Sequence, residues 1–273
     1  MQLTRKTIAK VIVAAFLLNL VVMGAGAWLA YQEAPPIPEE VVGPDGEAIV
    51  TDGEIRDGKA AFQQYGLMNH GSILGNGAYY GEDYTAETLE LKAQHMRDYY
   101  AREEYGAAYD ALDSAERAAV AQTVREDLDE AHDGSDTVEY SAAEAYAHER
   151  VTETYVERYH EGDHARGVPE DMIQSPEEAR EFADFALWTA WFSHTDRPGS
   201  DNSYTNEWPY SPPAGNDATG AAMIWSVVAM VLLVGAAGAA ILLYKSVKLP
   251  EPSAAGISVP EPGDVSVFPS QRA

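Results

Sequence analysis

Two long apolar segments near the ends of the chain place the strongest limit on its fold. Residues 11–31 and 219–244 contain no charged side chain. Each segment reaches the ~20 residues that a helix needs to cross the hydrocarbon core of a bilayer. Residues 32–218, between them, are far too polar to lie in lipid. The sequence therefore predicts a multi-pass protein of the cell membrane, with two transmembrane helices flanking one extramembrane domain.

Basic residues beside the two segments predict the orientation of the protein. They are Arg5, Lys6, Lys10, Lys245 and Lys248. Short basic flanks remain in the cytoplasm, so residues 1–10 and 245–273 are expected there and residues 32–218 outside. A cleaved signal peptide is the alternative for the first segment, but its apolar run is longer than the usual ~7–15 residues.

The central segment is strongly acidic. The chain has a formal net charge of -26, and all but three of its 44 acidic residues lie in residues 32–218. Such a surface repels phosphate groups, which excludes nucleic acid as a partner. The acids are spread along the whole segment and lysine is scarce, which favours adaptation to high salt, as in a halophile, over a localised acidic partner face.

The sequence contains no cysteine. Disulfides, thiolate metal sites and thiol catalysis are therefore excluded. A covalently attached c-type haem is excluded as well, because it needs a C-x-x-C-H motif.

Capping signals predict a mainly helical domain with long loops. Ser141 with Glu144 fits a capping box, and Ser175 followed by Pro176 fits a helix start. The expected helices begin near Asp52 and run over 85–102, 114–130, 141–160 and 175–193. The last of these is the most hydrophobic element outside the apolar segments, so we expect it to pack against the bilayer surface or another membrane protein.

Motifs for catalysis are weak. His148-Glu149 does not continue into H-E-x-x-H, and close carboxylate pairs are unavoidable in so acidic a chain. Neither apolar segment carries the ionisable residues that an intramembrane haem, metal or proton relay needs. By itself the chain resembles a scaffold or a fragment without a catalytic centre.

Two long loop motifs carry a specific resemblance. Residues 62–86, residues 195–209 and the helix around 188–192 resemble the N-terminal region of quinol-dependent nitric oxide reductases, which belong to the haem-copper oxidase superfamily. The resemblance covers most of residues 28–244. It is weaker over about 103–172, which is a candidate insertion.

The resemblance implies a mainly α-helical, cytochrome c-like domain that has lost its haem. His70 falls near the position of the vanished haem ligand. In the related enzymes that take electrons from cytochrome c, a Gly-x-Tyr motif lies near a calcium ion, and Gly77 and Tyr79 match this motif. A backbone carbonyl and a tyrosine oxygen are suitable ligands for a hard cation such as calcium. The two residues are therefore candidate calcium ligands.

The resemblance also implies a function and partners. The complete enzymes reduce two NO to N2O and water with electrons from quinol, using haem b and non-haem iron in a multi-span catalytic region. This chain would bind none of these cofactors alone and would have no catalytic residue. It would contact a catalytic subunit, or a missing C-terminal region, through Trp188, Trp191, Phe192, Tyr204 and Trp208.

Two other functions stay open. One is an accessory structural subunit of another respiratory haem-copper oxidase. The other is a two-span sensor, although residues 245–273 are too short and proline-rich for a signalling domain. These residues resemble the linker before a further span, so the chain is expected to be a truncated product or a split subunit.

Overall fold

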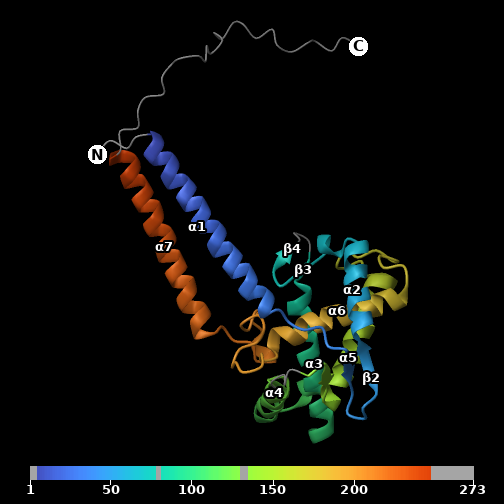
Figure 1. The fold of residues 1–273 in the computed structure, drawn as a ribbon. Coiled ribbons are helices and arrows are strands. Elements are labelled where there is room, and N and C mark those ends of the chain that lie inside the picture. Colours follow the sequence, from blue (N-terminus) through green and yellow to red (C-terminus); the bar gives the residue numbers. More distant parts are fainter. Residues whose placement is uncertain (1–4, 78–80, 130–134, 247–273) are drawn as a thin grey trace, which may run out of the picture. The chain divides into compact units, whose positions relative to one another are not determined.

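The computed structural model describes residues 5–77, 81–129 and 135–246. The chain divides into two units (Figure 1). One consists of Met1–Ala25 with Val228–Ala273, and the other is a folded domain of Gly26–Val227.

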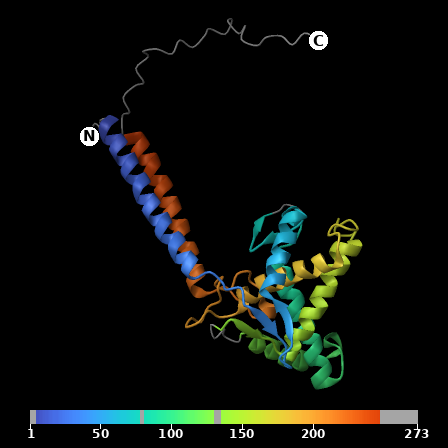
Figure 2. The same cartoon turned by 45° about the vertical axis from the view of Figure 1, so that its right-hand side comes forward.

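Two long apolar helices form the described parts of the first unit and continue into the domain. Helix α1 covers Arg5–Gln32 and helix α7 covers Gly220–Ser246 (Figures 1 and 2). Within them, Ala9–Gln32 and Gly220–Leu242 are long and apolar enough to cross a membrane, and neither segment is buried by the protein. These findings confirm the prediction of two candidate membrane helices around a central domain.

The domain is mainly helical, as predicted. Its α-helices are α2 (Asp52–Gln64), α3 (Tyr84–Tyr105), α4 (Ser114–Leu128), α5 (Ala142–Val156) and α6 (Pro176–His194). Shorter helices are η1 (Leu67–Asn69), η2 (Tyr109–Ala111), the π-helix η3 (Glu157–Gly162) and η4 (Pro212–Ala214). Helix α6 is the centre of the domain, because α2, α3 and α5 all pack against it.

Short strands complete the domain. A three-stranded sheet has the order β2 (Ala48–Thr51), β1 (Glu40–Val42) and β5 (Thr137–Glu139). Strand β1 is antiparallel to β2 and parallel to β5. A hairpin joins β3 (Ser72–Ile73) to β4 (Asn76–Gly77). None of these strands is predicted from the sequence, because two to four residues are too few to show an alternating pattern.

Most helix starts follow the predicted caps, with two corrections. Ser141 and Glu144 form the expected capping box of α5, and Ser175 caps α6. Helix α3, however, is capped by Asp83, whose Oδ1 accepts a hydrogen bond from the N–H of Ala86 at 3.0 Å. Thr85, at which the predicted helix 85–102 begins, is buried and is not the cap, and its hydroxyl lies 3.1 Å from that of Thr189.

The second correction concerns α4. Its cap is Asp113, whose Oδ1 accepts hydrogen bonds from the N–H groups of Ala115 and Glu116. Ser114, at which the predicted helix 114–130 begins, is the first helical residue and not the cap.

Helix α6 is buried inside the domain. Phe182 is completely buried and packs against the rings of Phe62, Tyr84, Tyr155 and Tyr159. The expectation that this helix packs against the bilayer surface or another protein is therefore wrong. Its apolar residues have partners within the domain, which the hydrophobicity of the helix alone does not reveal.

The residues of the candidate insertion, about 103–172, are integral to this fold. They supply β5 to the sheet and α5 to the packing around α6. Val124 and Leu128 of α4 join Leu89 and Met96 of α3 in a second buried cluster.

Candidate functional site

His70 lines a cavity of about 330 Å3 in the domain. This volume lies at the lower end of the ~300–1,000 Å3 found for small-molecule sites. The cavity lies between the loop after η1, the start of α3 and the region of η3. Its lining residues are His70, Gly81, Glu82, Tyr84, Glu87, Arg158, Tyr159, Arg166 and Val168.

A tight loop holds His70 at the cavity wall. Its backbone N–H donates to the carbonyl of Leu67 at 2.8 Å, and the Tyr84 hydroxyl donates to the same carbonyl at 3.1 Å. Gly81 has a φ of 153°, and a Cβ there would overlap the carbonyl oxygen of His70. The chain can therefore close against His70 only because position 81 has no side chain.

Two arginines and two glutamates also line the cavity. Arg158 Nη1 lies 2.8 Å from Glu87 Oε1, and both side chains are more than nine-tenths buried. Arg166 Nη1 lies 3.0 Å from Glu87 Oε1 and 3.0 Å from Glu82 Oε2. The four residues form one ion-pair network, so each charge on this wall has an opposite charge beside it.

The network also explains the electrostatics of the cavity. Burial raises the pKa of Glu87, and the positive charge of Arg158 opposes that rise. Burial also raises the pKa of Glu82, but hydrogen bonding to Arg166 and the nearby positive charges outweigh it, so the net shift is downward. The arginines favour the ionised form of both acids, but burial outweighs this effect at Glu87, whose pKa shifts upward overall.

The lining residues do not fit a covalently bound haem. The sequence has no cysteine to form the thioether bonds, and a charged network shares the lining of the cavity with His70. Within residues 5–77, 81–129 and 135–246, no group of three or more histidine, aspartate and glutamate side chains could hold a metal ion.

The predicted calcium residues are only partly described. Gly77 lies in β4, where it pairs with Ser72, whereas Tyr79 lies outside the described residues. Nearby, Asp83 Oδ2 accepts hydrogen bonds from the Ser72 hydroxyl at 2.7 Å and from the Gly75 N–H at 2.6 Å. That carboxylate organises the loop, and the calcium site stays a prediction.

The five predicted interface residues have different environments. Trp191 and Phe192 are each 4% exposed and lie in the domain core, so they offer little surface to a partner and their interface role stays a prediction. Trp188 is partly buried and donates from Nε1 to the carbonyl of Pro36 at 2.9 Å. Tyr204 packs on Trp191, whereas Trp208 is 44% exposed and is the member best placed to contact a partner.

The two loop motifs that carry the family resemblance meet in the structure. Trp208 Nε1 donates a hydrogen bond to the carbonyl of Leu74 at 3.3 Å. The same indole ring lies over Gly75, where a Cβ would be 3.6 Å from the ring. The loops around residues 72–77 and 203–210 therefore form one continuous surface.

The sequence alone assigns no role to Arg158 and Arg166. The one available signal is that basic residues are rare in a segment where acids are abundant. It cannot identify Glu87 as the shared partner, because Glu87 is 71 positions from Arg158 and 79 from Arg166.

Comparison with known proteins agrees with the resemblance of the two loops. The family model described as the NorB cytochrome c-like domain of nitric oxide reductase matches residues 38–210. The match covers more than half of the chain and includes the His70 cavity, all of α2 to α6, and both loops. No curated protein matches the sequence. The chain therefore belongs to the family of the NorB cytochrome c-like domain of nitric oxide reductase.

Proposed function

We propose that this chain is the N-terminal, electron-input side of a quinol-dependent nitric oxide reductase. The complete enzyme would reduce two NO to N2O and water, a step of denitrification, with electrons from quinol. The family match over residues 38–210 carries the proposal. The lack of cysteine favours the quinol-dependent form, because the cytochrome-dependent form requires a covalent haem in this domain.

In this proposal the domain has kept the shape of a cytochrome c and replaced the haem by internal contacts. His70 marks the former ligand position, and the network of Arg158, Arg166, Glu82 and Glu87 stabilises the cavity wall. Haem b, non-haem iron and calcium would be held in the complete enzyme.

The partner would be a multi-span catalytic region, supplied by a separate subunit or by the same polypeptide. Helices α1 and α7 would contact it within the membrane, since the described part of this chain does not bury their apolar side chains. Both ends of the chain would face the cytoplasm, as the basic flanks favour. Trp208 would contribute from the outer domain, because it is exposed and lies close to the second apolar helix in the sequence.

The test is to recover the protein with its partners from membranes of the producing cell. A tagged full-length chain is isolated in mild detergent, and its haems are identified by pyridine haemochrome spectra. We expect haem b without haem c, together with quinol-driven consumption of NO measured with an electrode. Preparations that contain haem c, or that consume oxygen but not NO, would contradict the proposal.

A variant tests the contribution of Trp208. Trp208→Ala should lower the haem b recovered per chain by about tenfold if the indole is an anchor of the interface. Tyr105→Ala is the control, because Tyr105 is 39% exposed at the end of α3 and belongs to neither loop motif. Equal recovery from both variants would remove Trp208 from the interface.

Adaptation to high salt is the second part of the proposal. It rests on the diffuse surplus of acidic residues and on the net charge of -26. At molar salt, screening weakens the repulsion between such residues.

A further inference from the structure

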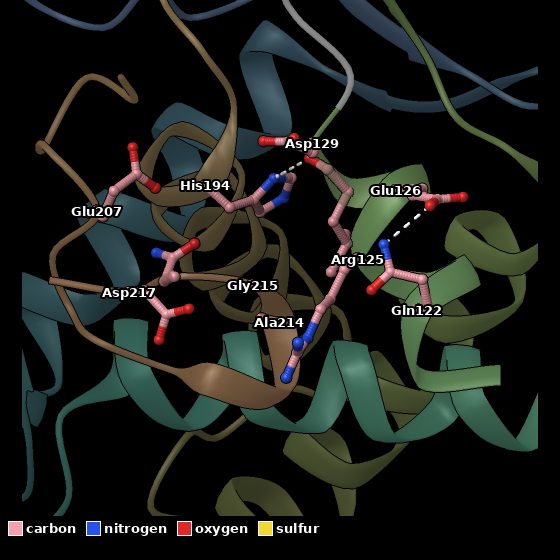
Figure 3. A pocket seen from close by; sticks show the side chains of 11 residues that line it. Gln122, Arg125, Glu126, Asp129, His194, Glu207, Ala214, Gly215 and Asp217 are labelled. Atoms are coloured by element: carbon pink, nitrogen blue, oxygen red, sulfur yellow. Dashed lines mark hydrogen bonds between the residues drawn. The ribbon is translucent and has the colours of Figure 1, made fainter. Parts of the chain in front are cut away.

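A second cavity, of about 200 Å3, lies beside α4 and the segment 207–217 (Figure 3). Its floor is formed by buried residues and its rim by exposed polar ones. The lining consists of Gln122, Arg125, Glu126, Leu128, Asp129, His194, Glu207, Ala214, Gly215, Asn216 and Asp217. The proposed reductase function assigns no role to this cavity.

One ring nitrogen of His194 makes a hydrogen bond, and the other makes none with the described residues. Its Nδ1 lies 2.8 Å from the carbonyl oxygen of Leu128. A carbonyl can only accept a hydrogen bond, so Nδ1 must carry the proton. Nε2 is buried and has no hydrogen-bond partner among residues 5–77, 81–129 and 135–246, and the residue as a whole is only 4% exposed. The ring therefore carries an unused lone pair, and His194 is one of the residues that line the cavity.

The ring is neutral as well as fixed in one tautomer. Burial lowers the pKa of His194 well below its usual value, and the positive charge of Lys92 lowers it further. A neutral imidazole nitrogen of this kind accepts a hydrogen bond or binds a metal ion. A ligand that enters the cavity must supply an N–H or O–H donor, or a metal, to satisfy Nε2.

Acidic side chains dominate the rim. Glu126, Asp129, Glu207 and Asp217 line the cavity, and among the described lining residues only Arg125 has a fixed positive charge. Figure 3 shows His194 between Glu207 and Asp217 on one side and Arg125 and Asp129 on the other. Such a rim attracts cations and repels anions.

The geometry distinguishes an organic cation from a metal ion. A metal would need several ligands, yet no three histidine, aspartate or glutamate side chains of the described chain are grouped for one. An alkylammonium ion needs only one acceptor per N–H, with carboxylates nearby to balance its charge. The volume of about 200 Å3 is below the ~300 Å3 of the smallest usual ligand sites, so the ligand would be short.

We propose that this cavity binds a small organic ammonium ion. One N–H of the ion donates to Nε2 of His194, and the carboxylates of Asp129, Glu207 and Asp217 balance its charge. A short diamine fits best, because its second ammonium group can remain at the acidic rim.

Calorimetry on the full-length chain in detergent tests the proposal. Diaminobutane is the probe, and butanediol is the neutral control of the same length. We expect saturable binding of the diamine at one site per chain and no binding of the diol. One equivalent of Ca2+ or Mg2+ per chain should not displace the bound diamine.

Three variants separate this site from general attraction to an acidic protein. Asp129→Asn combined with Asp217→Asn should weaken diamine binding about tenfold, since two rim charges are lost. Glu104→Gln removes an exposed charge from α3, outside the lining, and should change affinity less than about twofold. His194→Asn keeps a donor for the Leu128 carbonyl but has no atom equivalent to Nε2, and should also weaken binding about tenfold.

A measurement on the unmodified chain tests the role of His194 even if the His194 variant does not fold. In the unmodified chain labelled with 15N, the diamine should shift the resonance of His194 Nε2, and butanediol should not. Equal binding of the diol, equal losses in Glu104→Gln and the rim variant, or an unmoved Nε2 resonance would each overturn the proposal. So would a metal ion that binds this site in place of the diamine.

Discussion

The ammonium group of Lys92 lies 2.7 Å from Glu144 Oε1 inside the domain, which makes an ion pair between α3 and α5. The Lys92 side chain is completely buried, and its Nζ also lies 4.5 Å from the centre of the Tyr140 ring. Burial lowers the pKa of Lys92, but attraction to Glu144 outweighs this effect and the net shift is upward. The contact with Glu144 therefore favours the charged form of Lys92 in the folded domain.

Breaking this pair should be costly. Lys92→Met leaves the buried charge of Glu144 uncompensated and should lower the free energy of unfolding by about 3–5 kcal/mol. Urea unfolding of the full-length chain in detergent, followed by tryptophan fluorescence, measures the change. Adding Glu144→Gln, which retains the capping group of α5, should restore most of the loss. Arg56→Met breaks the exposed pair with Asp52 and should cost less than about 1 kcal/mol.

The contact between α2 and α6 depends on Gly58. A Cβ at this position would overlap the carbonyl oxygen of Glu181 on α6. Gly58→Ala should therefore destabilise the domain by about 1–3 kcal/mol or more, because the two helices must separate. Gly53→Ala, in the exposed first turn of α2, meets only ordinary contacts and should stabilise by up to about 1 kcal/mol. Equal effects in thermal unfolding would show that helix packing at Gly58 is loose.

The pair of His148 and Asp184 predicts a pH dependence. His148 Nε2 lies 3.0 Å from Asp184 Oδ1 in the core. Burial raises the pKa of Asp184, and the contact with His148 opposes the rise only in part. The folded state thus binds this proton more tightly than the unfolded state. Its contribution to stability is complete below the unfolded pKa of ~3.9 and is lost as pH rises through the folded pKa.

Asp184→Asn removes that contribution. As pH falls from neutral toward ~4, the free energy of unfolding of the original chain should increase relative to that of the variant. Urea unfolding at a series of pH values measures it. A difference that is constant with pH would show that Asp184 is not protonated more readily in the folded state.

Stability should also depend strongly on salt. Raising KCl from ~0.1 M to ~1 M shortens the screening length from ~10 Å to ~3 Å, which weakens repulsion among the surface acids. The melting temperature should rise steeply over this range and more slowly above it. Sucrose at matched osmolality is the control, and an equal rise in sucrose would attribute the effect to exclusion of solute instead of screening.

Local signals made the helices of the domain predictable. Ser141 with Glu144 and Ser175 with Pro176 act on neighbouring backbone groups, so their effect can be read from adjacent positions. The two apolar helices are predictable for a similar reason, because length and composition alone identify them.

The packing of the helices and the two cavities could not be predicted, because they depend on contacts between residues far apart in the sequence. The position of α6 depends on partners such as Phe62, which is 120 positions before Phe182. The His70 cavity likewise depends on Glu87 meeting Arg158. Strands of two to four residues are too short to show an alternating pattern in the sequence. The unpaired Nε2 of His194 cannot be predicted either, because the tautomer of the ring is set by the contact with Leu128, 66 positions away.

The parallel pairing of β1 with β5 has a consequence for the order of folding during synthesis. Glu40 pairs with Thr137, so the first strand must wait for nearly one hundred further residues before its sheet is complete. Helix α6 is made later still, and α2, α3 and α5 all need it as a partner. A ribosome-bound chain that ends before Pro176 therefore exposes three amphipathic helices without their common core. Newly made chains would be most vulnerable to aggregation and proteolysis just before α6 emerges.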